Sequence, residues 1–378
     1  MLSAGPIKRI YINARFLTQQ TTGVQRYAQE LVRAIDKLIT TGEIDPNEYD
    51  IVLLTPNREF KCNMELQNIK IRRAGFLAGH AWEQLELPVY SKDGLLFCPG
   101  NVAPVYSLVT GRKIVTTVHS LSFKYFPDAY SLAFKAVYET LIPLVLKYAD
   151  TVITVSDSER ELILKQYPGS ERALRVIHNG GVSDSFVQMV AEVESGLAGE
   201  EPFILFVGSL SKSKNLTGVL QAVEIINKSR EIHLKIVGEI TKTFQDSNFT
   251  IPESIRGKVE FKGQINDTKT LVSLYKGALC LAFPSFYESS GLPVIEAMAC
   301  GCPVIASDIP ALKERCGDAA VYCNPVDVYD IAQKILSVID EPLIKADLQQ
   351  KGFARNRQFT WKKCALETFD VIRKLVKS

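Results

Sequence analysis

The stretch "GALCLAFPSFYESSGLPVIEAMACGCPVIASD", residues 277–308, decides the fold because it holds a strand, a helix and a second strand in close succession. The apolar run "CLAFPS" is typical of a strand buried on both faces of a parallel sheet. Gly291 permits a tight backbone, and Pro293 suits the first position of a helix. The run "CPVIASD" then predicts the next strand. Such strand–helix–strand units build doubly wound α/β folds.

The same alternation of short apolar runs and helical patterns extends over the whole chain. Further strands are expected at residues 8–14, 49–55, 94–100, 113–119, 150–156, 203–209, 233–239 and 258–264. This pattern favours parallel sheets with helices on both faces. Because 378 residues exceed one ordinary core, the sequence predicts two doubly wound α/β domains.

The weakly patterned, glycine-containing segment 180–203 marks the expected domain boundary. We expect an N-terminal domain of residues 1–185 and a C-terminal domain of residues 200–359. Residues 360–378 carry apolar side chains at helical spacing, which predicts an amphipathic helix packed on another part of the chain. In open α/β sheets ligands bind beyond the carboxyl ends of the strands, so two facing domains would enclose a ligand between their loops.

Composition excludes several classes of protein. A formal charge of +2 provides no global basic field for nucleic acid. The eight cysteines form no CxxC pair, and several lie in apolar runs, which indicates free thiols in a reducing, cytoplasmic compartment. Cys300 and Cys302 flank a glycine without nearby histidines, so packing is favoured over metal binding. The N-terminus lacks the apolar region of a secretory signal, and the run 141–155 is too short and too charged to cross a bilayer.

A small basic cluster, Lys70, Arg72 and Arg73, has two interpretations. It is the solvated end of a strand, or it contacts anionic lipid headgroups as part of a peripheral membrane surface. The sequence leaves both interpretations open.

Two glutamates lie around the start of the helix predicted near Gly291. Glu288 lies in the loop after a strand, and Glu296 lies in the expected first turns of the helix. Unpaired N–H groups and the helix dipole make a helix N-terminus an anion site. Glu296 alone is explained as an acid that complements the dipole. Glu288, a second carboxylate beside an anion site, is unfavourable unless it binds something specific such as sugar hydroxyls.

A second candidate loop lies in "FVGSLSKSKNLTGVLQA", residues 206–222. The pattern predicts a strand, a turn at Gly208 and a loop with Lys212, Lys214 and Asn215 before a helix. A lysine in this place suits a phosphate group, with a solvated loop lysine as the alternative. The sequence contains neither a P-loop motif nor a GxGxxG dinucleotide motif.

These stretches resemble the retaining nucleotide-sugar glycosyltransferases of family four, which have the GT-B fold of two Rossmann-like domains facing across a cleft. The run "PSFYESSGLPVIEAMACGCPVIAS" resembles their E-x7-E signature, and "FVGSLSKSKNL" resembles their glycine–lysine loop. Five further stretches resemble other conserved motifs of this family and occur in the same order, namely "TTGVQRYAQELV", "VTTVHSLSF", "ADTVITVSDSER", "VIHNGG" and "QFTWKKCA". The resemblance covers nearly the whole chain. It implies that the C-terminal helix crosses back to the first domain.

The resemblance implies a role for each matching residue of the second domain. Glu288 would hold hydroxyls of the transferred sugar, Lys214 the diphosphate, and Glu296 the ribose. The backbone at the helix start and the preceding serine–lysine loop would also lie beside the diphosphate, and two later residues beside the base. These further donor positions are Gly291, Leu292, Pro293, Val294, Ser209, Lys212, Gln264 and Ile265.

In the first domain, the resemblance implies that His119 faces the reacting sugar, although a lone histidine is more often structural. Gly23 would keep the cleft open at the start of a helix, and its alternative is an ordinary helix-start glycine. Asn13, Arg15 and Arg26 are candidates for binding the acceptor or a phosphate.

Departures from the family pattern leave the donor open. Ser209 and Ser213 stand where basic residues are common, so Lys214 would neutralise more of the diphosphate charge, and Ser120 replaces a common aspartate. Because no Asp-x-Asp element is present, we expect metal-independent catalysis and no cofactor besides the nucleotide-sugar substrate. The implied reaction transfers a hexose to a lipid-linked or oligosaccharide acceptor in surface polysaccharide synthesis. GDP-mannose is the first expected donor, with UDP- and dTDP-sugars as alternatives.

Two other functions stay open. A nucleotide-sugar epimerase or hydrolase on the same fold would need no acceptor. A catalytically silent partner subunit would bind nucleotide without turnover, although the joint presence of Glu288, Glu296 and Lys214 argues against it.

Overall fold

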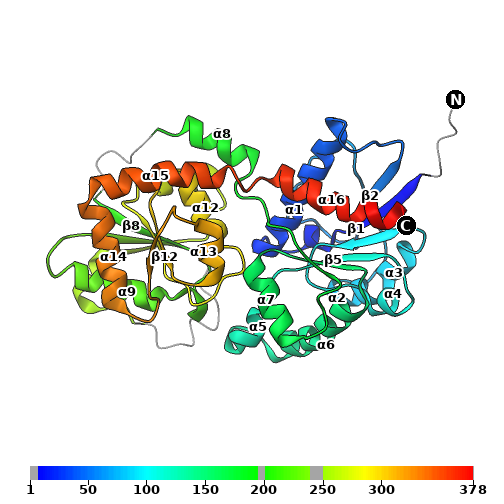
Figure 1. The fold of residues 1–378 in the computed structure, drawn as a ribbon, viewed down its shortest axis with the longest axis horizontal. Helices are drawn as coiled ribbons and strands as arrows, with labels where there is room; N and C mark the ends of the chain where they lie inside the picture. The colour runs from blue at the N-terminus through cyan, green and yellow to red at the C-terminus, as the bar shows by residue number, and fades with distance from the viewer. Residues whose placement is uncertain (1–6, 195–200, 239–249, 378) are drawn as a thin grey trace. The chain divides into compact units, whose positions relative to one another are not determined.

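The computed structural model describes residues 7–194, 201–238 and 250–377. The chain forms two units, each a doubly wound α/β domain, so the predicted fold class is confirmed (Figure 1). Unit 1 comprises Met1–Leu121, Ser131–Gly180 and Thr360–Ser378, and unit 2 comprises Ser122–Tyr130 and Gly181–Phe359.

This division differs from the expected domain boundaries in three places. The second segment of unit 1 ends at Gly180 rather than at residue 185, residues 122–130 belong to unit 2, and the main segment of unit 2 begins at Gly181 rather than at residue 200. Aromatic packing explains the second difference, because the ring of Tyr125 stacks 5.8 Å from that of Tyr287 and the ring of Phe126 lies edge-on at 6.1 Å. Local sequence patterns do not indicate a contact with a ring so distant along the chain.

In the described residues, the sheet of unit 1 is entirely parallel and has the strand order β3-β2-β1-β4-β5-β6-β7. Its strands are β1 (Lys8–Asn13), β2 (Tyr49–Thr55), β3 (Lys70–Arg73), β4 (Leu95–Cys98), β5 (Ile114–Val118), β6 (Thr151–Thr154) and β7 (Leu174–Val176). Its helices and helical turns are η1 (Arg15–Thr18), α1 (Gly23–Thr40), α2 (Gly79–Ala81), η2 (Trp82–Glu86), α3 (Leu87–Tyr90), α4 (Val105–Val109), α6 (Leu132–Tyr148), α7 (Asp157–Gln166) and α16 (Trp361–Lys377). The strand order reverses between β1 and β4, which makes the carboxyl ends of these strands a switch point where ligands bind in such folds.

Helices α1 and α16 pack against each other on one face of this sheet (Figure 1). Their apolar side chains join Ile10 and Ile12 of β1 in one core. Phe369 of α16 is 4% exposed, and its ring meets that of Tyr49 edge-on at 5.0 Å. The last helix of the chain is therefore part of the core of unit 1.

In the described residues, the sheet of unit 2 is also parallel, with the order β10-β9-β8-β11-β12-β13. Its strands are β8 (Phe203–Val207), β9 (His233–Val237), β10 (Val259–Gly263), β11 (Leu281–Phe283), β12 (Val304–Ser307) and β13 (Val321–Cys323). Its helices and helical turns are α5 (Ser122–Tyr125), η3 (Pro127–Ala129), α8 (Asp184–Glu192), η4 (Lys212–Lys214), α9 (Leu216–Ile226), η5 (Glu253–Lys258), α11 (Thr268–Gly277), α12 (Leu292–Ala299), α13 (Pro310–Cys316), α14 (Val328–Asp340) and α15 (Pro342–Asn356).

Alternate side chains of β8 enter two different cores. Phe203 and Leu205 pack with α11 and α12, whereas Ile204 and Phe206 pack with α9 and α14. A strand buried on both faces is apolar at successive positions, which explains the run "FILFV". The strand order reverses between β8 and β11, so the loops after these strands flank the switch point of unit 2.

Each strand expected from the sequence is present. The short edge strands β7 and β13 were not expected, because three residues give too little pattern to recognise. Strand β3 is the edge strand that contains Lys70, Arg72 and Arg73, and all three side chains are exposed. Their exposure agrees with a solvated strand end, and contact with lipid headgroups stays a prediction.

The apolar run 141–155 forms the end of α6 and all of β6. Its residues Ile142 and Val145 are fully buried in unit 1. Among the described residues, no helix combines the length and apolarity needed to cross a membrane.

Replacing Phe369 by alanine tests the contribution of α16 to unit 1. Loss of the buried ring should lower the free energy of unfolding by about 3–5 kcal/mol, because the cavity cannot fully close. Leu366→Ala on the same helix is the control, since this side chain is 37% exposed and its loss should cost within about 0.5 kcal/mol. Urea unfolding followed by circular dichroism measures both changes, and equal losses would contradict the packing described.

Candidate functional site

An ion pair joins the two loops at the switch point of unit 2. Lys214 precedes α9, and Glu288 lies between β11 and α12. The Nζ atom of Lys214 lies 2.5 Å from Oε1 of Glu288, and the hydroxyl of Ser285 donates to the same oxygen at 3.0 Å. Glu288 is 8% exposed, so its charge is largely shielded from water and is compensated by these two partners.

Asn215 fixes the loop that carries Lys214. Its backbone is left-handed, with φ of 57°, and its side-chain oxygen accepts the N–H of Gly218 to cap α9. Its amide donates to the carbonyls of Pro284 and Pro325 at 3.1 and 2.7 Å. The sequence analysis placed Asn215 in this loop before a helix, and the structure shows that it caps the helix, as asparagine commonly does.

Close backbone approach requires glycine at the end of β9. A Cβ atom on Gly238 would lie 1.8 Å from the carbonyl oxygen of Gly208, and Gly238 has φ of 151°. Any side chain there would displace the turn at Gly208. The loop that begins at Gly208 and carries Lys214 is thereby held against the neighbouring strand.

Helix α12 begins one residue earlier than predicted. Gly291 is the residue before the helix, with a left-handed φ of 63°, so Leu292 is the first helical residue and Pro293 the second. Pro293 has no N–H, and Val294 donates its N–H to the carbonyl of Gly291 at 3.3 Å. The start of α12 therefore provides the N–H groups of Gly291 and Leu292 as donors to an anion. These are fewer donors than the sequence suggested.

Glu296 lies in the second turn of α12, so its interpretation as a first-turn acid that complements the dipole is wrong. It is 2% exposed, and the hydroxyl of Tyr275 on α11 donates to its Oε2 at 2.9 Å. Tyr275 was not recognised because the sequence does not show which face of α11 meets α12.

The remaining predicted donor residues do not converge on this ion pair. Lys212 is 60% exposed along its side chain and lies 3.8 Å from Asp128 of the segment 122–130. Ser209 is exposed. Gln264 and Ile265 follow β10, which is separated from β8 by β9, and Ile265 packs partly into the core.

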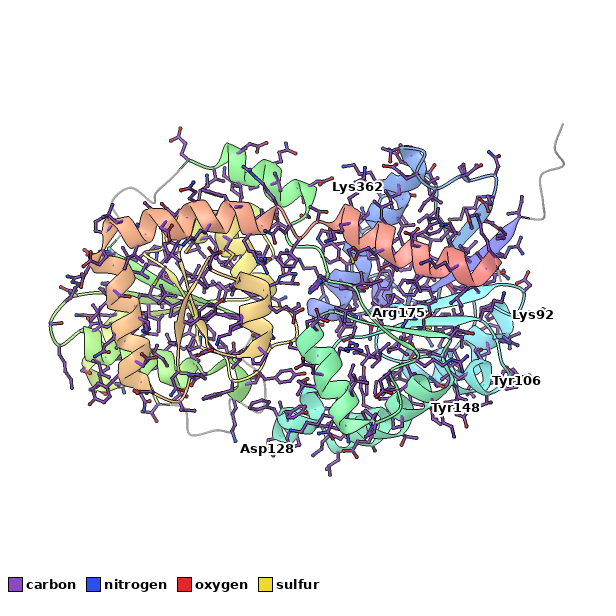
Figure 2. All side chains as sticks on the ribbon, viewed as in Figure 1. Lys92, Tyr106, Asp128, Tyr148, Arg175 and Lys362 are labelled. Carbon is purple, nitrogen blue, oxygen red and sulfur yellow. The ribbon has the colours of Figure 1, made fainter. Side chains whose placement is uncertain are left out.

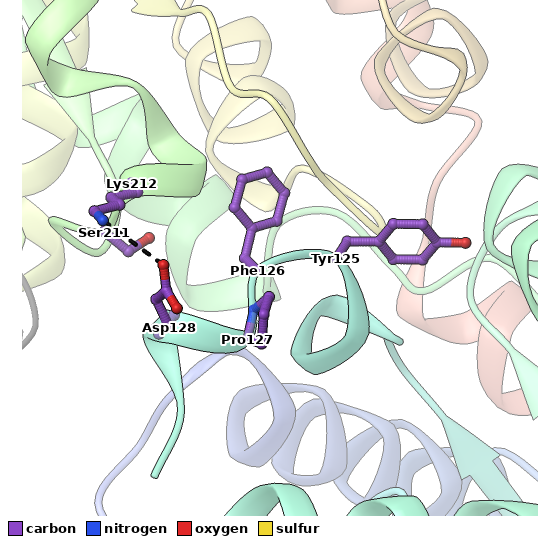
Figure 3. Close-up of a pocket in the computed structure, with 7 residues that line it drawn as sticks. Tyr125, Phe126, Pro127, Asp128, Ser211 and Lys212 are labelled. Carbon is purple, nitrogen blue, oxygen red and sulfur yellow. Dashed lines mark ion pairs between the residues drawn. The ribbon is translucent and has the colours of Figure 1, made fainter. Parts of the chain in front are cut away.

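A small pocket lies beside the loop of Lys212 in unit 2. It has a volume of about 100 Å³ and is lined by Tyr125, Phe126, Pro127, Asp128, Ala129, Ser211 and Lys212. Figure 3 shows Asp128 directed toward Lys212 and the ring of Phe126 rising from the same segment. The pocket is much smaller than a nucleotide sugar requires, so it does not by itself define a donor site.

In unit 1, His119 follows β5 and is 7% exposed. Its Nε2 donates to the carbonyl of Pro99 at 2.7 Å, and its backbone N–H donates to Asn101 at 2.7 Å. Its ring meets that of Tyr27 edge-on at 4.6 Å. Burial lowers its pKa to about 4, so the ring is neutral at pH 7.

Gly23 is the first residue of α1, after a capping box formed by Thr22 and Gln25. A Cβ atom on Gly23 would meet no atom within 4 Å. The interpretation of Gly23 as an ordinary helix-start glycine therefore agrees with its contacts inside the protein. Arg26 lies in the first turn of the same helix.

Asn13 and Arg15, at the end of β1, both contact a carboxylate that the sequence analysis missed. Asn13 donates to Oε1 of Glu83 at 2.6 Å, and Nε of Arg15 lies 3.4 Å from that oxygen. Nδ1 of His80 lies 2.8 Å from Oε2 of Glu83. The signal was present in "GHAWEQLELP", where histidine and glutamate lie three residues apart beside apolar residues.

All eight cysteines are free thiols, and seven of them are buried. Cys300 and Cys302 are 8% and 4% exposed, and burial raises the pKa of both thiols. Their predicted role in packing is confirmed.

Two family models match the chain. The model described as "Glycosyl transferases group 1" matches residues 190–356, and that described as "Glycosyltransferase Family 4" matches residues 96–181. Among curated proteins, O-antigen chain mannosyltransferase B of Escherichia coli is 26% identical over 271 residues, which cover 70% of this chain and 71% of that protein. O-antigen chain mannosyltransferase RfbU of Salmonella typhimurium is 28% identical over 216 residues, 57% of this chain and 58% of that protein.

Solved structures show the same fold. Sucrose-phosphate synthase from Thermosynechococcus elongatus has a TM-score of 0.70 and 21% identity, covering 98% of this chain and 99% of that one. WaaG, a glycosyltransferase involved in lipopolysaccharide biosynthesis, has a TM-score of 0.67 and 13% identity, covering 96% of this chain and 99% of that one.

The fold and these matches together define an enzyme class, the glycosyltransferases with the GT-B fold. Within it, the family-four model matches residues 96–181 of the chain, and the chain is similar to bacterial O-antigen mannosyltransferases.

The lowered pKa of His119 gives a direct spectroscopic prediction. Its ring proton signals should not titrate between about pH 5.5 and pH 8, because the folded-state pKa lies below this range, whereas an exposed histidine titrates near 6.5. Proton NMR on the protein and on a His119→Asn variant, which identifies the signal, measures this. A His119 midpoint near 6.5 would contradict the buried, neutral ring.

Proposed function

We propose that unit 2 binds a nucleotide-sugar donor and that the enzyme transfers its hexose, with retention at the anomeric carbon, to an acceptor hydroxyl. The observation that carries this proposal is the Lys214–Glu288 pair beside the start of α12, at the carboxyl edge of the sheet. An ammonium, a helix start and a carboxylate in one place suit a diphosphate that adjoins a hydroxyl-rich sugar.

The leaving diphosphate gains negative charge as its bond to the sugar breaks. Groups that stabilise this charge lower the barrier. Lys214 supplies one positive charge, and the start of α12 supplies N–H donors and the positive end of the helix dipole. We infer that these groups stabilise the leaving group without a metal ion.

Glu288 and Glu296 are assigned to two sets of hydroxyls. A bound diphosphate would compete with Glu288 for Lys214 and leave the carboxylate to accept hydrogen bonds from the sugar. Glu296, held by Tyr275, is assigned to the ribose. Gln264 and Ile265 are assigned to the base.

Retention follows when the acceptor attacks from the face that the diphosphate leaves. The acceptor oxygen bonds to the anomeric carbon, the bond from that carbon to the phosphate oxygen breaks, and the acceptor proton passes to the departing phosphate. His119, neutral at pH 7, would act on the sugar as a hydrogen-bonding group rather than as a proton carrier.

The proposed donor is GDP-mannose, because the curated relatives are named as O-antigen mannosyltransferases. UDP-sugars are the alternative, since the solved structure of HepE, 15% identical, is described in complex with UDP and glucose. The proposed acceptor is a lipid-linked or free oligosaccharide of surface polysaccharide synthesis.

A donor panel of GDP-, UDP- and dTDP-sugars, assayed with a chelator, tests the function. Lys214→Ala and Glu288→Ala should each lower kcat by about a hundred- to a thousandfold, because each removes a preorganised group at the donor. Lys228→Ala, at an exposed lysine in the turn after α9, is the matched control and should leave kcat unchanged.

Full activity of both site variants would remove the assignment of Lys214 and Glu288. Release of free sugar or an epimer from donor alone would favour a hydrolase or epimerase. Nucleotide binding without turnover in the presence of lipid-linked acceptor would favour a silent subunit.

We also infer that unit 1 contacts an anionic membrane, where a lipid-linked acceptor would reside. The support is a set of exposed apolar side chains beside arginines. Phe76, Leu85, Val89, Tyr106 and Val109 are between 55% and 84% exposed. Arg58 donates to the carbonyl of Phe76 at 2.7 Å, and the guanidinium of Arg112 lies 5.3 Å from the ring centre of Tyr106. Figure 2 shows Tyr106 at the surface of this unit.

Sedimentation with phosphatidylglycerol vesicles tests this contact. The double variant Phe76→Ser, Leu85→Ser should bind at least about tenfold more weakly, because each apolar side chain contributes about 1.5–3 kcal/mol when it leaves water. Leu343→Ser and Val326→Ser remove comparably exposed side chains from unit 2 and serve as controls. Equal binding to phosphatidylcholine vesicles, or no effect of the double variant, would contradict the contact.

A further inference from the structure

The carboxyl end of β1 in unit 1 carries a buried polar cluster, formed by Asn13, Arg15, His80 and Glu83, that the donor assignment does not use. Glu83 is 1% exposed, and both of its carboxylate oxygens have partners. Oε1 accepts a hydrogen bond from Asn13 at 2.6 Å and lies 3.4 Å from Nε of Arg15, while Oε2 lies 2.8 Å from Nδ1 of His80. We call these four residues the Glu83 cluster.

The local backbone is unusual where Glu83 lies. Trp82–Glu86 forms a π-helical turn between α2 and α3. Such turns are rare and occur frequently at functional sites, because the extra residue changes the direction of the side chains around it. Trp82 anchors the turn, since it is fully buried and its indole N–H donates to the carbonyl of Ala74 at 2.7 Å.

The cluster lies at the switch point of the sheet of unit 1. Asn13 ends β1, and its side-chain nitrogen also lies 3.9 Å from the sulfur of Cys98, which ends β4. The strand order reverses between these two strands. In open α/β sheets this edge is where ligands bind.

The charge balance indicates that His80 has a role beyond compensating Glu83. A buried carboxylate requires a partner, and Arg15 and Asn13 already supply a cation and a hydrogen bond. His80 is the solvent-facing member of the cluster, because its side chain is 36% exposed whereas those of Arg15 and Glu83 are 11% and 1% exposed. A purely structural anchor needs no exposed imidazole.

The contact with Glu83 determines which nitrogen of the His80 ring carries the proton. A carboxylate only accepts hydrogen bonds, so Nδ1 carries the proton that it donates to Oε2. In the neutral ring, Nε2 then carries the lone pair. No described residue forms a hydrogen bond with Nε2, and the side chain is 36% exposed, so this acceptor is available to a ligand.

We propose that Nε2 of His80 accepts a hydrogen bond from a hydroxyl of a saccharide acceptor and that Glu83 positions the ring. The inference rests on the proposed glycosyl transfer and names an acceptor contact for it in unit 1. Glu83 acts through His80 and is a positioning residue. Removal of His80 weakens acceptor binding and leaves donor binding intact.

The experiment measures acceptor and donor separately in the full-length protein. The probe is α-linked mannotriose, with its Kd measured by NMR titration in the absence of donor and its KM measured at saturating donor. His80→Ala should raise both values for the acceptor about tenfold, the effect of one lost hydrogen bond, with the donor KM unchanged. His80→Gln, which keeps an acceptor at the ε position, should recover part of the loss.

A double variant tests whether Glu83 acts through His80. Glu83→Gln should raise the acceptor KM, and Glu83→Gln combined with His80→Ala should be no worse than His80→Ala alone, because both changes remove the same contact. His233→Ala, at the amino end of β9 in unit 2, is the matched control. Thermal unfolding of each variant separates binding effects from lost stability.

Each outcome decides the proposal. Unchanged mannotriose binding in His80→Ala, or equal losses for donor and acceptor, would overturn it. If no donor in the panel is turned over, the glycosyl transfer fails, yet His80-dependent mannotriose binding would still support this site and its absence would overturn it.

Discussion

The contact between Lys214 and Glu288 depends on the parallel arrangement of the second sheet. Parallel strands end at one edge, so the loops after β8 and β11 meet although 74 positions separate the two residues. Two contacts hold the loops together in addition to the charge pair. The amide of Asn215 donates to the carbonyl of Pro284, and the backbone N–H of Phe286 donates to the carbonyl of Ser213 at 2.8 Å. A largely buried carboxylate without its cation would be costly, so the fold and the charge pair support each other.

Buried ionisable groups are accommodated in two different ways in this protein. Glu288 and Glu83 keep a cation within reach, and both have hydrogen-bond donors as well. His119 has no such partner in its hydrogen bonds, which join it to a carbonyl and an amide, and its pKa falls to about 4. Burial without a counter-charge favours the neutral ring, whereas burial beside a cation permits a carboxylate.

The fold could be predicted from the sequence because strands buried on both faces are apolar at successive positions. Lys214 and Glu288 could be identified as candidate site residues because both follow strands. The sequence could not predict the surroundings of Glu296, because its burial and its contact with Tyr275 depend on which face of α11 meets α12. The contact of Glu83 with Asn13 joins residues 70 positions apart, and the π-helical turn that directs Glu83 has no simple sequence signal. The packing of Tyr125 on Tyr287 likewise has no local sequence signal, and it places residues 122–130 in unit 2 rather than in unit 1.

Two serines of the loop before α9 limit the positive charge available to the proposed diphosphate. Ser209 and Ser213 stand where basic residues are common, and the hydroxyl of Ser213 forms a hydrogen bond with that of Ser211 at 3.0 Å. Lys214 then brings one positive charge to a group with more than one negative charge. Lys212 is the other cation in this loop. It lies 3.8 Å from Asp128, and an ion pair between two exposed side chains contributes little to stability. A diphosphate would therefore compete easily with Asp128, and the segment 122–130 would lose a contact to the loop as the donor gained one.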